Sequence, residues 1–522
     1  MTVNSLFFLL FLAVLFVVYY VLCPLRFRWI VLLAASVWFY ALACAASPLY
    51  LIATSISIWA AGILMDRLER ICSQQIAEQK AKPAVLKKEC KKKKKKIVTA
   101  AVILNVGILL VLKYGGFFMG IGNSLLGFAG INLPVPKFMI PLGISYYTLI
   151  AIGYLIDIYK GKIKAQRNYA KLLLFLGYFP QMTQGPMNRY KPMAEQLYTG
   201  HKFDYRNLSF GCQRILWGLF KKFVISDRMQ PVMQSIFDNY SSLSGLTCFL
   251  GCVYMTIWMY CDFSGYMDIV AGASEIFGIH IEENFKRPFF SQSLAEYWRR
   301  WHLTLSSWFR DYMFYPLAVS SPATKFGKLG RKWFGARIGK LFPALFALTF
   351  VWSCTGFWHD ASWRYILWGV ANGVFIMGAM VMEPWFEKGK KALHIRSDSW
   401  YWKLFGILRT FALVCVLKVF PGPADTTGSF LFIKQMFTSL RLPAGMEEVL
   451  PGLLPGEAMF LGGALLLVFV VDLIQEKTPV RELLAKQWAP VRWFCYLAVL
   501  TMLLCMGQFQ NPMAGGFAYA QF

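Results

Sequence analysis

Two of the five histidines in this 522-residue chain lie among aromatic residues, where they could transfer protons. His359 stands in the segment Thr-Gly-Phe-Trp-His-Asp-Ala-Ser-Trp-Arg, directly after Trp358. An imidazole can accept a proton near neutral pH, and an apolar aromatic setting favours its neutral, basic form. His359 is therefore a candidate general base that would take a proton from a hydroxyl group. The alternative on this pattern is a core histidine hydrogen-bonded to a carbonyl group.

His302 lies in a second cluster, which is rich in tryptophan, arginine and hydroxyl groups. From Glu296 the segment reads Glu-Tyr-Trp-Arg-Arg-Trp-His-Leu-Thr-Leu-Ser-Ser-Trp-Phe-Arg-Asp-Tyr. The guanidinium groups of Arg299 and Arg300 could hold a phosphorylated donor by bidentate hydrogen bonds. The alternative is an interfacial belt of aromatic and arginine side chains that only anchors a helix.

Two carboxylates, Asp262 and Asp268, close a further apolar run. Six residues apart on a helix, they would not share a face closely, so we favour structural ion pairs with nearby arginines over a metal site or a glycosidase-type pair. The twelve cysteines lie mostly in apolar stretches without a CxxC pair. The sequence thus predicts neither a metal site nor a disulfide framework, and no motif for a resident cofactor is present.

The elements that must position these residues are membrane helices. Hydrophobic residues make up 57% of the chain and charged residues only 16%, and several apolar runs approach the roughly 20 residues that span a bilayer. These numbers exclude a soluble domain, a nucleic-acid module and a fibrous protein. We expect an all-α polytopic membrane protein with eleven membrane segments. Ten lie at 3–22, 27–46, 97–120, 138–158, 246–263, 341–357, 363–382, 402–420, 458–473 and 491–506, and one lies between 27–46 and the basic loop 66–96. The shorter runs 172–184 and 208–225 are expected to be re-entrant or interfacial.

Charge predicts the orientation of these segments. The net charge is +27, and the basic residues are grouped between apolar runs, which is typical of cytoplasmic loops. The Lys-rich segment 66–96 is expected to be a cytosolic loop near anionic lipid, and 421–456 an extracytoplasmic loop. The N-terminus would then lie outside, with the first apolar run retained as a helix because it lacks the features of a signal peptide. We expect one membrane domain over 1–522, in the plasma membrane, without a nucleic-acid partner.

A series of motifs resembles the membrane-bound O-acyltransferase family, in the branch of the alginate O-acetylase membrane subunit, with the teichoic-acid D-alanyl transferase membrane subunit more distant. In order, the motifs are Pro141-Leu-Gly-Ile-Ser-Tyr-Tyr-Thr148, Tyr154-Leu-Ile-Asp157, Tyr159-Lys-Gly161, Phe179-Pro-Gln-Met-Thr-Gln-Gly-Pro-Met-Asn-Arg-Tyr190, Asp262-Phe-Ser-Gly-Tyr-Met-Asp268, Glu283-Asn-Phe285, Tyr297-Trp-Arg-Arg-Trp-His-Leu-Thr-Leu-Ser306, Trp308-Phe-Arg-Asp-Tyr312, Gly356-Phe-Trp-His359 and Trp368-Gly369. The closing Tyr519-Ala-Gln-Phe522 is also similar to that branch. The motif core covers 141–373.

The resemblance implies an acyltransferase whose helices surround a central funnel or tunnel. In that reading His359 is the catalytic base and His302 a second functional residue, supported by Arg299, Arg300 and Asp311, with Trp301, Trp358 and Asp262 as further supporting positions. The donor would be a cytosolic thioester, acetyl-CoA or a carrier-bound acyl group, and the acceptor an extracellular or cell-wall polysaccharide. An extracytoplasmic partner of the SGNH-hydrolase type is also implied.

Three positions depart from the family's pattern. Asp360 replaces a common glycine after the catalytic histidine and could raise the pKa of His359. Ala318-Val319 replace a glycine pair, and Asn372 stands where another histidine is common.

Two other functions stay open on the sequence. D-alanyl transfer from a carrier protein to teichoic acid fits the same basic cytosolic face, because charge alone does not separate the two donors. A transporter or flippase would also accommodate broken helices and buried polar groups, but no internal repeat supports it.

Overall fold

The computed structural model describes residues 2–43, 48–78, 82–130, 133–135, 138–509 and 517. The described part is all-α, with 78% of residues in helices, and Phe285 and Trp301 form an isolated antiparallel bridge. The fold class expected from composition is therefore confirmed. The closing aromatic motif 519–522 lies outside the described residues.

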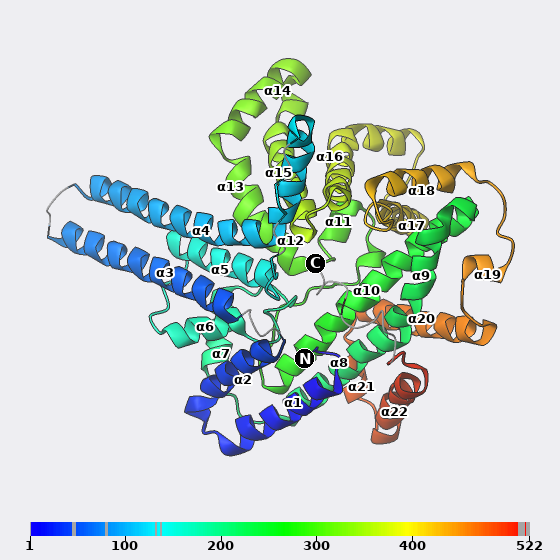
Figure 1. The fold of residues 1–522 in the computed structure, drawn as a ribbon, viewed down its shortest axis with the longest axis horizontal. Helices are drawn as coiled ribbons and strands as arrows, with labels where there is room; N and C mark the ends of the chain where they lie inside the picture. Colours follow the sequence, from blue (N-terminus) through cyan, green and yellow to red (C-terminus); the bar gives the residue numbers. More distant parts are fainter. Residues whose placement is uncertain are drawn as a thin grey trace. The chain divides into compact units, whose positions relative to one another are not determined.

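The first of two compact units comprises Met1–Cys212 and Val270–Glu282. Its helices are α1 (Leu6–Val17), α2 (Arg28–Ala43), α3 (Pro48–Ala77), α4 (Pro83–Leu126), α5 (Ile144–Tyr159), α6 (Tyr169–Gly177), α7 (Tyr190–Tyr198) and most of α8 (Tyr205–Phe220), with the short turns η1 (Val18–Leu22), η2 (Leu25–Phe27) and η3 (Gly127–Ala129) (Figure 1). The helices α3 and α4 pack side by side, and α5 packs on both.

The second unit comprises Gln213–Ile269 and Glu283–Phe522. Its helices are η4 (Lys221–Ser226), α9 (Asp227–Asn239), η5 (Tyr240–Ser242), most of α10 (Gly245–Ile276), η6 (Pro288–Phe290), α11 (Leu294–Trp298), α12 (Leu303–Phe309), η7 (Arg310–Phe314), α13 (Tyr315–Ala318), α14 (Ser321–Gly339), α15 (Phe342–His359), α16 (Trp363–Ala392), α17 (Trp400–Leu417), α18 (Thr426–Thr438), α19 (Met446–Val449), α20 (Pro455–Gln475), α21 (Val480–Ala485) and α22 (Ala489–Met506). This unit holds every residue predicted above to carry chemistry.

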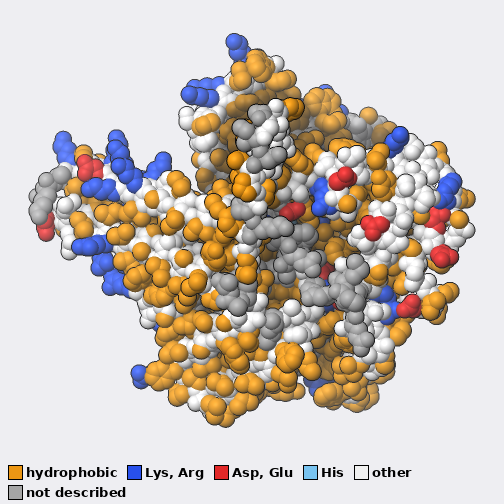
Figure 2. All heavy atoms as spheres, viewed as in Figure 1, with side chains coloured by type: hydrophobic (Ala, Val, Ile, Leu, Met, Phe, Trp, Pro, Cys, Tyr) orange, Lys and Arg blue, Asp and Glu red, His pale blue; other side chains and the backbone are white. Residues whose placement is uncertain are grey.

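The helices long and apolar enough to cross a membrane agree with the expected segments. Eight single helices meet this description in the described residues: α2 with its preceding turn, α3, α4, α10, α16, α17, α20 and α22. The pair α14 and α15, bent by 97° at a short break, makes a possible ninth, and Leu6–Leu22 and Ile144–Tyr159 are shorter apolar helices. Together these are the eleven segments predicted from the sequence. Figure 2 shows hydrophobic side chains over much of the visible surface, as a lipid-facing protein requires.

The segment 66–96 was expected to be a loop, and this expectation is wrong. The helix α3 continues to Ala77 and α4 begins at Pro83, so both membrane helices extend into the Lys-rich region. Lysine, glutamate and alanine are strong helix formers, which explains why a polar segment remains helical. Lys94 of α4 forms an ion pair of 2.6 Å with Glu69 of α3 and joins the two extensions. Figure 2 shows the basic side chains gathered at this end of α3 and α4.

The segment 421–456 also has more structure than a loop, because α18 and α19 lie within it. Asp425 caps α18 by accepting a hydrogen bond from the backbone N–H of Gly428, as a helix N-cap normally does. Its expected extracytoplasmic position stays a prediction.

Candidate active site

His359 is held at the tight junction between α15 and α16. It is the last residue of α15, and α16 begins four residues later. The two helices approach closely through glycines: a Cβ on Gly356 would lie 2.3 Å from the carbonyl oxygen of Tyr365. A Cβ on Gly369 would lie 2.6 Å from the carbonyl oxygen of Trp352. Only glycine permits this approach, which brings the first turns of α16 against the end of α15.

Aromatic rings surround the His359 side chain. Its ring centre lies 5.0 Å from that of Trp358 and 5.0 Å from that of Trp368, both nearly perpendicular, while Tyr365 stacks at 6.1 Å. Only 4% of His359 is exposed. The aromatic rings thus keep the imidazole largely out of contact with water.

His302 is fixed by a polar contact and by its backbone. It precedes α12 with a φ of +48°, in the left-handed region that few residues other than glycine adopt, and such strain is concentrated at functional sites. Its Nδ1 lies 3.1 Å from Oδ1 of Asn284, and this oxygen also accepts hydrogen bonds from the backbone N–H and hydroxyl of Thr304. Because Oδ1 is an acceptor, Nδ1 must donate, which assigns the tautomer with an unprotonated Nε2.

Burial lowers the pKa of His302 to about 3. The imidazole is therefore neutral at physiological pH, and His302 cannot act there as a cation for a phosphate group. It can position a group or accept a hydrogen bond through Nε2.

The structure brings the two histidines together on one indole. The Trp358 ring centre lies 6.2 Å from that of His302 and 5.0 Å from that of His359. His302 precedes α12, and His359 ends α15 57 residues later in the sequence. The sequence pattern alone could not predict that the two side chains lie close together. Trp301, predicted as a supporting residue, is 1% exposed and stacks on Tyr297 beside this site.

The two predicted donor-binding arginines have different environments. Arg300 forms ion pairs of 2.9 Å with Glu296 and with Glu476, so its guanidinium is already neutralised. Arg299 is exposed, and the described residues give it no ion pair. Of the two, Arg299 is thus the one available for an anionic donor.

Asp311 and Asp262 lie in other ion pairs. Asp311 pairs with the preceding Arg310 at 3.0 Å. Asp262 is 1% exposed and accepts from Nζ of Lys222 at 2.7 Å, and Lys222 also lies 2.9 Å from Asp227. Asp262 is therefore part of a buried charge cluster.

Asp268 has basic partners of its own, Lys221 at 2.6 Å and Arg214 at 2.9 Å. Ion pairing of Asp262 and Asp268 was expected from the sequence, and basic partners are found for both. At Asp268 the expected arginine is Arg214, and lysines of η4 supply the further contacts given above for both carboxylates.

Sequence reasoning missed Lys418, which follows α17. Its Nζ lies 5.2 Å from the ring centre of Trp301 and 5.5 Å from that of Trp368, and only 3% of the residue is exposed. A signal was present in the sequence: Lys418 is the single charged residue between Arg409 and Asp425, and a lone charge in an apolar run is a functional hypothesis by default.

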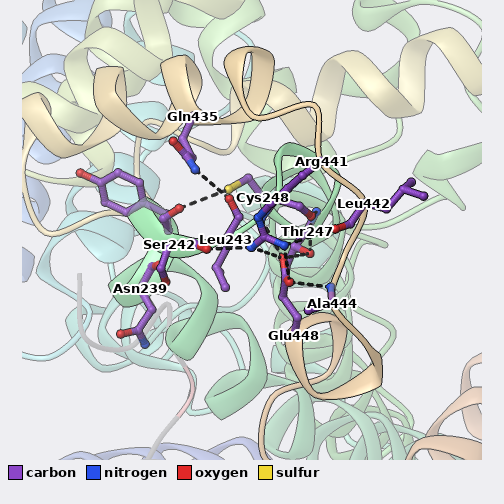
Figure 3. A network of polar contacts seen from close by, with 12 residues as sticks. Asn239, Ser242, Leu243, Thr247, Cys248, Gln435, Arg441, Leu442, Ala444 and Glu448 are labelled. Carbon is purple, nitrogen blue, oxygen red and sulfur yellow. Dashed lines mark hydrogen bonds and ion pairs between the residues drawn. The ribbon is translucent and has the colours of Figure 1, made fainter.

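A second polar network lies away from the histidines and was also not predicted. Glu448 accepts hydrogen bonds from the backbone N–H groups of Ser244 and Ala444, from the Thr247 hydroxyl and from Arg441 (Figure 3). Burial alone would raise the pKa of Glu448, but these hydrogen bonds outweigh it and lower the pKa to about 2. The network ties the 421–456 segment to the start of α10.

Comparisons with known proteins agree with the motif series. Residues 160–330 match the model of the membrane-bound O-acyltransferase family. The chain is 30% identical over 382 residues to the "Probable alginate O-acetylase AlgI" of Azotobacter vinelandii, covering 72% of this chain and 67% of that protein. It is 28% identical over 363 residues to the peptidoglycan O-acetyltransferase of Helicobacter pylori, covering 64% and 63%. It is 29% identical over 279 residues to the teichoic acid D-alanyltransferase of Bacillus subtilis, covering 52% and 66%.

These alignments span about half to two thirds of the length of the curated relatives. The family model covers the carboxylates Asp262 and Asp268 and the segment from Glu296 to Tyr312 that holds His302. The longer alignment with the Azotobacter protein extends the similarity over most of the chain. The motifs, the membrane helices and these matches together show that this chain belongs to the membrane-bound O-acyltransferase family.

Proposed function

We propose that this protein transfers an acetyl group from acetyl-CoA on the cytosolic side toward a hydroxyl of an extracellular or cell-wall polysaccharide, with His359 as general base. The observation that carries this proposal is the meeting of His359 and His302 on Trp358, within one buried aromatic cluster. A buried neutral imidazole is suited to take a proton from a hydroxyl group as that group attacks a thioester.

The chemistry requires one proton to move twice. His359 removes the hydroxyl proton while the oxygen attacks the thioester carbon, and the C–S bond then breaks as the carbonyl re-forms. The departing thiolate takes the proton back from His359, so the base is restored. The neutral His302, held by Asn284, positions the reacting groups through Nε2 without changing charge.

The proposed orientation of the chain places the donor and the acceptor on opposite sides of the membrane. The Lys-rich ends of α3 and α4 would lie in the cytosol, because basic residues are retained there, and the N-terminus and the 421–456 segment would lie outside. The exposed guanidinium of Arg299 is then the donor-side contact for the phosphates of CoA.

The relatives' names support the proposed acceptor, whereas the proposed partner rests on the family resemblance alone. These relatives are named for alginate, peptidoglycan or teichoic acid, each of which is an extracytoplasmic polymer that carries hydroxyl groups. We include in the proposal an extracytoplasmic SGNH-hydrolase-like protein that receives the acetyl group and delivers it to the polymer.

The test is transfer of labelled acetyl from acetyl-CoA to envelope polysaccharide by membranes that contain wild type or His359→Ala at equal abundance. Loss of a general base should lower the rate by about 10²–10⁴-fold. His280→Ala is the matched control, because His280 is exposed and lies outside the aromatic cluster. It should retain the wild-type rate.

The outcomes separate the alternatives. Equal transfer by wild type and His359→Ala would overturn the base role. Transfer of D-alanine from a charged carrier protein, with none from acetyl-CoA, would favour the teichoic-acid reaction and overturn the acetyl donor.

A further inference from the structure

Lys418 is a buried cation whose position requires an explanation. It is 3% exposed, and its Nζ contacts Sδ of Met259 at 2.9 Å and faces the rings of Trp301 and Trp368. The described residues place no carboxylate within ion-pair distance of it. A thioether and two indoles leave the positive charge of this ammonium without a neutralising anion.

Packing alone does not account for this arrangement. A cation–π contact with each ring stabilises an ammonium only modestly. Removing an ammonium from water costs more than such contacts return, even after the protein relaxes. The two rings lie 5.2 and 5.5 Å away and offset only part of this cost. A methionine or leucine would fill the same space more favourably, so the presence of an amine at this position points to a ligand.

The ammonium lies beside the proposed base. The ring centre of Trp368 is 5.5 Å from Nζ of Lys418 and 5.0 Å from the ring centre of His359, so these two groups are no more than 10.5 Å apart. On its other side, Lys418 faces Trp301, the residue before His302. Both His359 and Lys418 are almost fully buried, and both lie against the ring of Trp368.

This upper limit accommodates a reacting acyl group. Hydrogen bonds of about 3 Å would join the base to the hydroxyl oxygen and the cation to the carbonyl oxygen, the attacking oxygen would lie about 3 Å from the acyl carbon, and the C=O bond adds about 1.2 Å. The resulting contour of about 10 Å lies within the 10.5 Å limit set by Trp368.

We propose that Lys418 is a catalytic residue that binds the carbonyl oxygen of the acyl donor and stabilises the oxyanion formed when the acceptor attacks. This inference rests on the proposed function. The hydroxyl oxygen forms a bond to the acyl carbon, the carbonyl π electrons move to oxygen, and the hydroxyl proton goes to His359. The oxyanion then re-forms the carbonyl, the C–S bond breaks, and the thiolate takes the proton from His359. The ammonium of Lys418 stays protonated throughout.

The rate experiment compares wild type, Lys418→Met and Lys418→Arg across acetyl-CoA concentrations. Removing one oxyanion donor should lower kcat by about 10²–10³-fold. KM for acetyl-CoA should change by less than about threefold, because the contact strengthens only in the transition state. Lys418→Arg keeps the charge and should recover at least tenfold of the lost rate. Lys403→Met, an exposed lysine of the same helix, is the matched control and should keep the wild-type rate.

A binding experiment tests the same contact without turnover. S-carboxymethyl-CoA places a carboxylate one methylene beyond the sulfur, next to the position of the acetyl carbonyl, and S-acetonyl-CoA places a neutral ketone at the same distance. Lys418→Met should weaken binding of the carboxymethyl compound at least tenfold and leave that of the acetonyl compound within threefold.

Each outcome decides between roles. A Lys418→Met kcat within fivefold of wild type, or equal loss of binding for both analogues, would overturn the proposal. A raised KM with unchanged kcat would assign Lys418 to donor binding instead. A fall in abundance and thermal stability that Lys418→Arg does not relieve would make the residue structural. Because His359→Ala is assayed beside these variants, its wild-type-like activity would instead reveal failure of the proposed function itself.

Discussion

Buried lysines in the second unit have two different kinds of surroundings. Lys221 and Lys222 lie in η4; Lys221 reaches the half-buried carboxylate of Asp268 and Lys222 the buried one of Asp262, each at less than 3 Å. Lys418 is just as deeply buried but faces two indoles and a thioether. A complete ion pair satisfies its own charges and needs no ligand, whereas a cation without an anion stays available to one. The difference separates a structural charge cluster from a candidate catalytic group.

The largest expected effect breaks the paired cluster. Lys222→Met leaves Asp262 and Asp227 buried without their shared cation, which should lower the free energy of unfolding by about 3–5 kcal/mol. Thermal unfolding in detergent measures this change. Lys418→Met should unfold at or above the wild-type temperature, because it removes an uncompensated charge. Equal destabilisation by Lys222→Met and Lys418→Met would contradict the proposed difference between an ion-paired lysine and one that faces aromatic rings.

A compensated variant sharpens the same comparison. Adding Asp227→Asn and Asp262→Asn to Lys222→Met removes the stranded negative charges, so more than half of the lost stability should return. The thermal midpoint of the triple variant is compared with that of Lys222→Met. The exposed Lys434→Met serves as control and should match wild type. A triple variant no more stable than the single one would show that packing, not charge, holds this cluster.

The sequence predicted the membrane helices well because hydrophobic length is a local property. The eleven expected segments each correspond to an apolar helix, although the polar helical extension of α3 and α4 was taken for a loop. Hydropathy marks where the bilayer would end, and it does not show where a helix ends when Lys and Glu continue it in water.

The sequence predicted the candidate site only in part. His359 and His302 stood out because each lies in an aromatic cluster along the chain. Their contact through Trp358 depends on the approach of the residue before α12 to the end of α15, which local patterns do not encode. Arg300 was expected to bind a donor, but Glu476, 176 residues away, neutralises it. Such long-range partners decide whether a charged group is free for function.

His302 gives a smaller, pH-dependent test of the effect of burial on a titratable group. The pKa of its imidazole falls from 6.5 to about 3 on folding, so the unfolded chain binds a proton that the folded chain does not. Stability should therefore be lost as the pH falls from 6.5 toward 3, by about 2 kcal/mol at pH 5. His302→Gln, which does not titrate, should show a flatter thermal midpoint between pH 7 and pH 5. An unchanged slope would mean that the imidazole is protonated in the folded protein.

Glu448 provides the smallest effect, because its network lies partly in solvent rather than in the buried core. The pKa of this carboxyl is lowered from 4.5 to about 2, so its stabilising contribution is complete above pH 4.5 and is lost as the pH falls toward 2. Glu448→Gln should cost roughly 1–3 kcal/mol at pH 7, since hydrogen bonds to a charged group are lost. It should also remove part of the decline in thermal midpoint between pH 5 and pH 3.

The matched control for this substitution is Glu447→Gln, the exposed neighbour on α19. It should leave both the midpoint and its pH dependence unchanged, because surface charges contribute little. If Glu448→Gln behaves like Glu447→Gln, the hydrogen bonds of Figure 3 are too weak to stabilise the Glu448 carboxylate in the folded protein. Interactions with charged groups would then stabilise this protein only where solvent is excluded, as in the ion pairs of Lys221 and Lys222. The comparison of these ion-paired lysines with Lys418 would then apply to the buried core alone.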